Sequence, residues 1–223
     1  MISVLNKLFI ANRTLPQLLH KSLAIQHLTT ISRETQKMTS NQDFCTEIVW
    51  MDLEMTGLDV IKDKILEVSC LITDKNLNVI AEGPCFAINH PENVFQEMND
   101  WCIKHHNESG LVENCLKSQI TNDKAEQILL DFIKQHVPKG KCPLAGNSVY
   151  MDRLFLRQLM PSVDDYMHYR IIDVSTIKEL ARRWHPKLLD AAPKKKFSHR
   201  SLDDIYDSID ELKFYRQTFF KDT

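Results

Sequence analysis

Two acidic residues, Asp52 and Glu54, are separated by one position within the apolar segment EIVWMDLEM. Because successive side chains of a strand point to opposite faces, a strand formed here would carry both carboxylates on one face. Burying two like charges together raises their pKa values and destabilises a fold unless a cation offsets the charge. The pair therefore indicates either a cation site or a strand end that emerges into solvent at Thr56 and Gly57, which is the commoner meaning of the pattern alone.

Two further acidic positions favour the cation site. Asp152 follows a short apolar segment in PLAGNSVYMD, and Asp204 lies in HRSLDD at the start of a predicted helix. With Asp52 and Glu54 they make four carboxylates where strand ends and helix starts converge, enough to hold two oxygen-preferring ions such as Mg²⁺ or Mn²⁺. Two ions about 4 Å apart, one activating water and the other stabilising the leaving oxygen, serve phosphodiester cleavage.

A histidine precedes the last of these carboxylates. His199 lies five residues before Asp204, so the two would be about 140° apart on a continuous helix. We therefore predict His199 in the preceding loop, with Ser201 as the N-cap and Asp204 three residues on in a capping-box-like pattern. A loop histidine with a pKa near about 6.5 suits a general base, although a single histidine is more often structural. Asp204, with Asp203, could equally stabilise the helix N-terminus.

The elements that position these side chains follow from residue patterns. Apolar and β-branched segments predict three strands joined as a meander, at 47–55, 65–73 and 78–88. Helical periodicity predicts five helices, at 93–106, 123–136, 151–160, 176–184 and 201–220. Short strands at 143–147 and 170–175 each lead into one of them. A meander followed by strands that alternate with helices predicts an α/β fold with a mixed central β-sheet flanked by α-helices.

Charge is unevenly distributed along the chain. Residues 1–40 carry five Lys and Arg against Glu34 alone. The whole chain has 28 basic and 30 acidic residues, so 23 basic and 29 acidic residues remain beyond residue 40. Proteins that bind long nucleic acid usually have an excess of basic residues. We expect no long nucleic acid as a partner, so a nucleic-acid substrate would be short.

The N-terminal segment has the composition of a targeting sequence. Residues 1–33 lack Asp and Glu, contain spaced basic residues and have leucines compatible with one helix face. This predicts a mitochondrial transit peptide over 1–40, disordered or helical, with an ordinary tail as the alternative. The catalytic domain is predicted at 44–223. A start at Met38 would give a cytoplasmic form.

The cysteines and the apolar segments exclude other classes. The six cysteines are scattered without a CxxC pair, which indicates reduced thiols in an intracellular protein and no structural zinc site. No stretch approaches the roughly 18 apolar residues of a membrane span, so we predict no membrane association.

Four segments are familiar in their order and spacing: VWMDLEMTGLD, GNSVYMDRLFL, YRIIDVSTIKELARRW and HRSLDDIYDSIDELKFYR. Over about residues 45–218 they closely resemble the oligoribonuclease family, in the His subtype of the DEDD exonucleases. The resemblance implies an RNase H-like exonuclease fold, a two-metal mechanism and a homodimer. It also implies release of 5′-mononucleotides from the 3′ end of very short RNAs, dinucleotides above all.

The resemblance also implies roles for single residues. The metal ligands are matched by Asp52, Glu54, Asp152 and Asp204, and the general base by His199. Leu58 and Trp101 match residues that wedge and stack the bases. The cap on the terminal 5′ phosphate is matched by Ser148, Arg170 and Ser175, and by Tyr169, which the partner subunit contributes.

Three features stay open beside this match. Ser201 replaces an alanine that is frequent in the family, away from any ligand position. The run 194–196 of three lysines could steer phosphate into the site, although a solvated loop is the commoner meaning. Alternative functions are a related exonuclease that acts on longer RNA or on DNA 3′ ends, and an inactive nucleic-acid-binding module.

Overall fold

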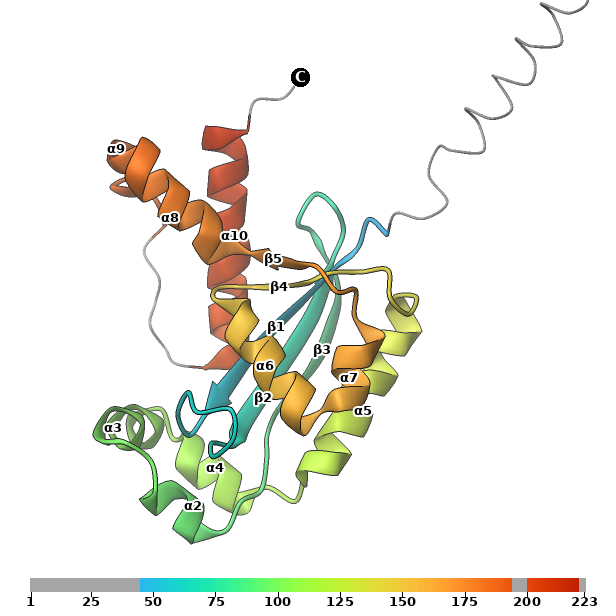
Figure 1. Cartoon of the computed structure of the whole chain (residues 1–223), viewed down its shortest axis with the longest axis vertical. Coiled ribbons are helices and arrows are strands. Elements are labelled where there is room, and N and C mark those ends of the chain that lie inside the picture. The colour runs from blue at the N-terminus through green and yellow to red at the C-terminus, as the bar shows by residue number, and fades with distance from the viewer. Residues whose placement is uncertain (1–44, 194–199, 221–223) are drawn as a thin grey trace, which may run out of the picture. The chain divides into compact units, whose positions relative to one another are not determined.

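The computed structural model describes residues 45–193 and 200–220, and the N-terminal segment 1–40 and His199 lie outside the described residues. Five strands form one sheet: β1 (Ile48–Met55), β2 (Ile65–Thr73), β3 (Val79–Ala87), β4 (Leu144–Gly146) and β5 (Ile171–Asp173). Their order is β3-β2-β1-β4-β5. β1, β2 and β3 pair antiparallel, whereas β4 and β5 run parallel to β1 and to each other. The predicted mixed α/β sheet is therefore confirmed (Figure 1).

Nine helices are described around this sheet: α2 (Glu92–Gln96), α3 (Asp100–Glu108), α4 (Leu111–Lys117), α5 (Asn122–His136), α6 (Val149–Leu159), α7 (Pro161–Tyr166), α8 (Val174–Trp184), α9 (Pro186–Leu189) and α10 (Ser201–Phe219). The helix predicted over 93–106 is divided into α2 and α3. The division falls at Asn99, whose side chain caps α3 by accepting a hydrogen bond from the backbone N–H of Cys102 (3.0 Å). The sequence analysis did not predict the short helices α4, α7 and α9.

Strand β1 divides the core into two layers because its side chains alternate. Met51 and Leu53 are buried in a cluster with residues of α5, α6 and α7. Trp50 is buried in a second cluster with Ile205 and Ile209 of α10. Asp52 and Glu54 have the same parity as Trp50, so they project toward the layer that contains α10. The alternation predicted from the sequence thus brings the carboxylate pair to the α10 side of the sheet.

Two cysteines far apart in sequence are joined. Cys45 and Cys142 form a disulfide with their Cα atoms 5.5 Å apart, although 97 positions separate them. Cys142 lies just before β4, and the Val49 N–H of β1 donates to the Pro143 carbonyl (3.2 Å). This parallel pairing brings the two cysteines together, and the prediction that all cysteines are reduced is wrong for this pair. The other four cysteines (70, 85, 102 and 115) are free.

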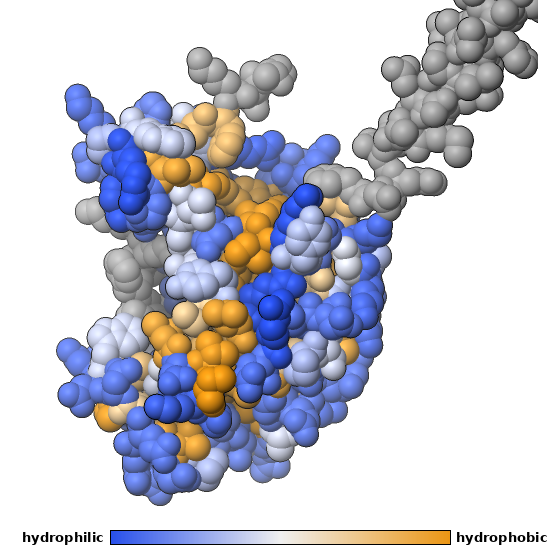
Figure 2. Space-filling model, viewed as in Figure 1, coloured by the Kyte–Doolittle hydropathy of each residue, from blue (hydrophilic) through white to orange (hydrophobic). Residues whose placement is uncertain are grey.

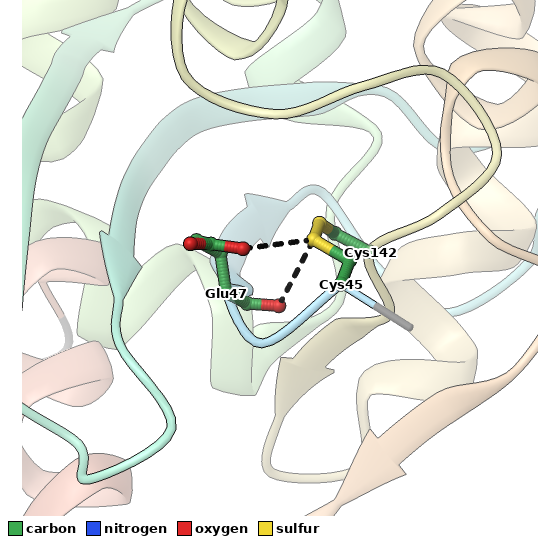
Figure 3. Close-up of side chains that lie close together, drawn as sticks. All are labelled: Cys45, Glu47 and Cys142. Carbon is green, nitrogen blue, oxygen red and sulfur yellow. Dashed lines mark hydrogen bonds between the residues drawn. A yellow bond between two sulfur atoms is a disulfide. The ribbon is translucent and has the colours of Figure 1, made fainter. Parts of the chain in front are cut away.

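An acidic side chain lies beside this disulfide. Glu47 Oε2 is 3.1 Å from the Cys45 Sγ atom (Figure 3). Cys45, Glu47 and Cys142 together have the composition of a cation site, but disulfide sulfurs are not thiolates and do not supply that ligand set.

Within the described ranges, no helix is long and apolar enough to cross a membrane.

Candidate active site

Three of the four predicted carboxylates converge at one end of β1. Asp52 and Glu54 of β1 and Asp204 of α10 place one carboxylate oxygen each within 4.8 Å of the others. All three side chains are half-buried. Asp204 lies in the first turn of α10, and its backbone N–H donates to the Arg200 carbonyl (3.1 Å). The end of a strand and the start of a helix thus bring together residues about 150 positions apart.

Asp152 lies against the backbone of the same pair. It belongs to the first turn of α6, is 6% exposed, and its Oδ1 accepts a hydrogen bond from the Leu53 N–H (2.9 Å). Leu53 separates Asp52 from Glu54, and α6, which carries Asp152, packs in the core cluster on the side of the sheet opposite α10. Burial raises the pKa of Asp152 to about 7, while the hydrogen bond from Leu53 acts in the other direction.

The electrostatics of the cluster favour a cation. Burial raises the pKa of Glu54 to about 8, and the charges of Asp204, Glu67 and Asp152 act in the same direction, whereas Arg200 lowers it. Without a counter-charge, Glu54 therefore holds a proton at neutral pH. The donor set consists of carboxylate oxygens, which hard divalent cations prefer. A divalent ion would replace that proton and offset the mutual repulsion, so the residues fit a metal centre.

The start of α10 differs from the sequence prediction. Arg200 is the N-cap, Ser201 is the first helical residue, and no side chain of the N-cap bonds the helix. The predicted N-cap at Ser201 is wrong, because its hydroxyl donates to Glu67 Oε1 of β2 (2.7 Å) instead of bonding its own helix. Lys194–Lys196, like the predicted general base His199, lie outside the described residues.

Two predicted phosphate-binding serines are neighbours. Ser148 and Ser175 have their hydroxyl oxygens 3.2 Å apart, and the Ser148 N–H donates to Ser175 Oγ (2.9 Å) and to Asp173 Oδ1 (3.0 Å). Ser148 adopts a left-handed conformation (φ 54°) as the N-cap of α6. Both hydroxyls therefore lie at the turn between β4 and α6.

Asn147, to which the sequence analysis gave no role, holds this turn. Its Oδ1 accepts a hydrogen bond from Ser175 Oγ (3.0 Å), and its Nδ2 donates to Ser208 Oγ (2.8 Å) and to Glu211 Oε2 (3.1 Å). The side chain thus connects the β4–α6 turn to α8 and α10. A polar residue directly after a buried strand was the available signal, but its partners lie on distant helices.

Tyr169 and Arg170 precede β5 and are exposed. The Arg170 guanidinium carbon lies 5.2 Å from the centre of the Tyr169 ring, and the Arg170 N–H donates to His168 Nδ1 (3.1 Å). Tyr169 is 73% exposed. Its ring lies beside that of His168, with 4.5 Å between the centroids. Among the interactions described for the chain, none joins this pair to Ser148 or Ser175.

Leu58 and Trp101 are also exposed, at 68% and 55%. Leu58 follows β1 in a loop that Thr56 closes by donating to Asp63 Oδ1 (2.7 Å). A Cβ atom at Gly57 would lie 2.4 Å from Asp63 Oδ2, so a larger residue there would displace the carboxylate that accepts from Thr56.

The helix that carries Trp101 is attached to β1. His106 of α3 donates from Nε2 to the Met55 carbonyl (2.9 Å), one residue beyond Glu54. Trp101 lies one turn earlier in the same helix, and its ring packs on that of His105 with 4.2 Å between the centroids. An aromatic surface is therefore presented near the end of β1 that carries the carboxylates.

Comparisons with known proteins agree with this architecture. A family model described as an exonuclease (RNase_T) matches residues 49–212. The chain is 60% identical to the probable oligoribonuclease of Drosophila melanogaster, over 83% of this chain and 88% of that protein. It is 52% identical to the mitochondrial oligoribonuclease of Homo sapiens, over 82% of this chain and 78% of that protein.

A solved structure supports the fold. Exonuclease I from Methylocaldum szegediense superposes with a TM-score of 0.61 at 15% sequence identity. The match covers 79% of this chain and 42% of that structure, so the chain spans about two fifths of that larger enzyme. At this identity the likeness concerns the fold alone, and it agrees with the exonuclease fold predicted from the sequence.

Proposed function

Because the chain belongs to the oligoribonuclease family of exonucleases, we propose that it is a divalent-metal-dependent 3′→5′ exoribonuclease of very short RNAs. Dinucleotides are its main substrates, and 5′-mononucleotides are its products. The observation that carries this proposal is the convergence of Asp52, Glu54 and Asp204 within 4.8 Å. Asp152, buried against Leu53, completes the set.

The four carboxylates would hold two Mg²⁺ or Mn²⁺ ions. When bound, such ions neutralise the carboxylates and offset the charge that develops on a phosphodiester during hydrolysis. Asp52, Glu54 and Asp204 approach from the α10 side of β1, and Asp152 from the α6 side, so the acidic groups surround the end of the strand. The raised pKa values of Glu54 and Asp152 favour their protonated forms until a cation enters.

His199 is the proposed general base. It takes a proton from the attacking water, whose oxygen forms a bond to the phosphorus of the 3′-terminal nucleotide. The bond between phosphorus and the 3′ oxygen of the preceding nucleotide breaks, and that oxygen takes up a proton in place of the one that His199 accepted and then releases. The released nucleotide keeps its 5′ phosphate. The position of His199 in the sequence, directly before Arg200 and α10, supports this role.

Substrate length is proposed to be limited by a cap on the terminal 5′ phosphate. Ser148 and Ser175 would bind phosphate oxygens at the start of α6, where a helix N-terminus favours an anion. Arg170 would add a planar guanidinium suited to phosphate. Its exposure leaves the guanidinium accessible to a substrate. The acidic balance of the chain beyond residue 40 also supports a short substrate.

Leu58 and Trp101 are proposed to bind the bases. An exposed indole can stack on any base, since every base has a π-face, and an exposed leucine can separate two neighbouring bases. The attachment of α3 to Met55 supports this role, because it fixes Trp101 relative to β1.

We also propose a homodimer in which each subunit contributes Tyr169 to the phosphate cap of its partner. Tyr169 is among the most exposed aromatic side chains described, and no contact to Ser148 or Ser175 within the chain is described for it. Apolar residues gather on the face of the molecule on which α6 lies (Figure 2). Exposed apolar side chains of that helix include Tyr150 and Leu154. Such a surface suits an interface between copies.

The proposed location is the mitochondrion, with residues 1–40 as a transit peptide and 44–223 as the exonuclease domain. The composition of the N-terminal segment supports it, and so do the mitochondrial relatives. A form that starts at Met38 would be cytoplasmic.

Three substrates test the proposed function: a 5′-phosphorylated RNA dinucleotide, a twenty-nucleotide RNA and a single-stranded DNA. We expect the dinucleotide to be hydrolysed fastest, with mononucleotides as products. Equal rates on all three would favour a related exonuclease of longer RNA or DNA. Binding without hydrolysis would favour the inactive nucleic-acid-binding module.

A further inference from the structure

A buried carboxylate outside the predicted ligand set lies at the start of α10. Glu67 of β2 is 1% exposed. It accepts hydrogen bonds from the Ser201 N–H (3.1 Å) and hydroxyl (2.7 Å), and from Arg200 Nε (3.3 Å) and Nη2 (3.0 Å). Four hydrogen bonds compensate for burying this charge, which would otherwise be costly.

These contacts replace the missing N-cap of α10. The first N–H groups of a helix lack partners inside the helix, and a negative charge near them is stabilising. No side chain of the N-cap residue bonds this helix. Glu67 provides the acceptor from another element, 134 positions away in sequence. The same first turn of α10 carries Asp204, so Glu67 bonds the turn that presents this carboxylate.

The register of the sheet relates this anchor to the carboxylates of β1. Glu67 pairs with Glu54 across β1 and β2, and Ser69 pairs with Asp52. Ser69 Oγ lies 2.7 Å from Ser201 Oγ, and because the Ser201 hydroxyl donates to Glu67, Ser69 is the donor to Ser201. The two residues of β2 that face the acidic pair of β1 therefore both hold the first residue of α10.

We propose that Glu67 is a positioning residue of the metal centre. It holds the first turn of α10 at the register at which Asp204 joins Asp52 and Glu54, and it acts through Asp204 and not by contact with the substrate. The inference rests on the proposed function and adds a residue that supports the proposed metal centre. Arg200 balances the charge of Glu67, so the anchor adds no net charge beside the cluster.

Two substitutions separate positioning from charge. Glu67→Gln removes the charge, whereas Glu67→Asp keeps the charge but withdraws the carboxylate by one methylene. Mn²⁺ binding to the full chain is measured by calorimetry without substrate, together with kcat and KM for a 5′-phosphorylated RNA dinucleotide. Positioning predicts that both variants lose about 10- to 100-fold in Mn²⁺ affinity and in kcat, the range found for partners that orient metal ligands. KM should change by less than kcat.

Glu82→Gln is the matched control. Glu82 of β3 also joins the sheet to α10, by accepting a hydrogen bond from the Tyr206 hydroxyl (2.6 Å), but it lies on the surface and away from the first turn. Mn²⁺ affinity and kcat should stay unchanged in this variant.

Three results would overturn the proposal. If Glu67→Asp has the same Mn²⁺ affinity and kcat as the wild type, only the charge of residue 67 matters. A lower melting temperature with unchanged Mn²⁺ affinity and kcat in both variants would mean a structural role alone, as would failure of both to fold while Glu82→Gln folds. If wild-type protein binds Mn²⁺ but does not cleave the dinucleotide, the proposed function fails, and the Mn²⁺ affinities still decide the role of Glu67.

Discussion

The raised pKa of Glu54 makes the stability of the metal-free protein fall as pH rises. Its pKa increases from an ordinary 4.5 to about 8 on folding, chiefly because of burial and then because of Asp204, Glu67 and Asp152. Between these values the unfolded chain releases a proton that the folded chain keeps. The favourable contribution is complete below pH 4.5 and is lost as pH rises through 8. The whole shift corresponds to roughly 5 kcal/mol, of which about 3 to 4 kcal/mol is lost between pH 5 and pH 8.

Urea unfolding in EDTA at pH 5, 6, 7 and 8 measures this loss against Glu54→Gln. Asp152 contributes in the same direction, with a pKa near 7, and its charge also acts on Glu54. The difference in the free energy of unfolding between wild type and variant therefore reports the titration of Glu54 together with its interaction with Asp152. Mn²⁺ should flatten the wild-type curve, because the cation binds the ionised folded form. Parallel curves for wild type and Glu54→Gln in EDTA would refute the reasoning.

Three further outcomes are expected. Cys142→Ser should lower the free energy of unfolding by up to about 4.7 kcal/mol in denaturant titrations, because the disulfide closes a loop of 97 positions. Hydrolysis should not change, and a reducing agent should abolish the difference; a persisting difference would contradict the disulfide's role. If its indole stacks on a base, Trp101→Ala should weaken dinucleotide binding by about 1 to 3 kcal/mol, which is measured as a higher KM. An unchanged KM would exclude stacking. Residues 1–40 fused to a fluorescent reporter should reach mitochondria, and a diffuse cytosolic signal would refute the targeting prediction.

The strands were predictable because their residue patterns are local. β1 alternates around Asp52 and Glu54, and β2 is apolar and buried along most of its length, so composition and period 2 were sufficient. α5 was predicted within one residue, since Thr121 caps its start and its apolar positions repeat at helical spacing. The short helix α4 carries too few periodic positions to be recognised.

The connections between distant elements were not predictable. Asp204 was assigned to the site by its place in a motif, but its anchor depends on Glu67, whose partner Ser201 is 134 positions away. The wrong N-cap at Ser201 has the same cause, because a local capping pattern cannot reveal an acceptor on another strand. The Cys45–Cys142 disulfide likewise follows from the pairing of β1 with β4, which spacing in the sequence does not show.

The central claim is that the carboxylates around β1 support metal-dependent hydrolysis of short RNA. Its most direct test is the release of mononucleotide from a 5′-phosphorylated RNA dinucleotide by wild type and Asp152→Ala, each with Mg²⁺ and with EDTA, and with folding checked by circular dichroism. We predict product only from wild type with Mg²⁺, and a folded but inactive Asp152→Ala. Hydrolysis by Asp152→Ala, or by wild type in EDTA, would contradict the metal centre built from Asp52, Glu54, Asp152 and Asp204.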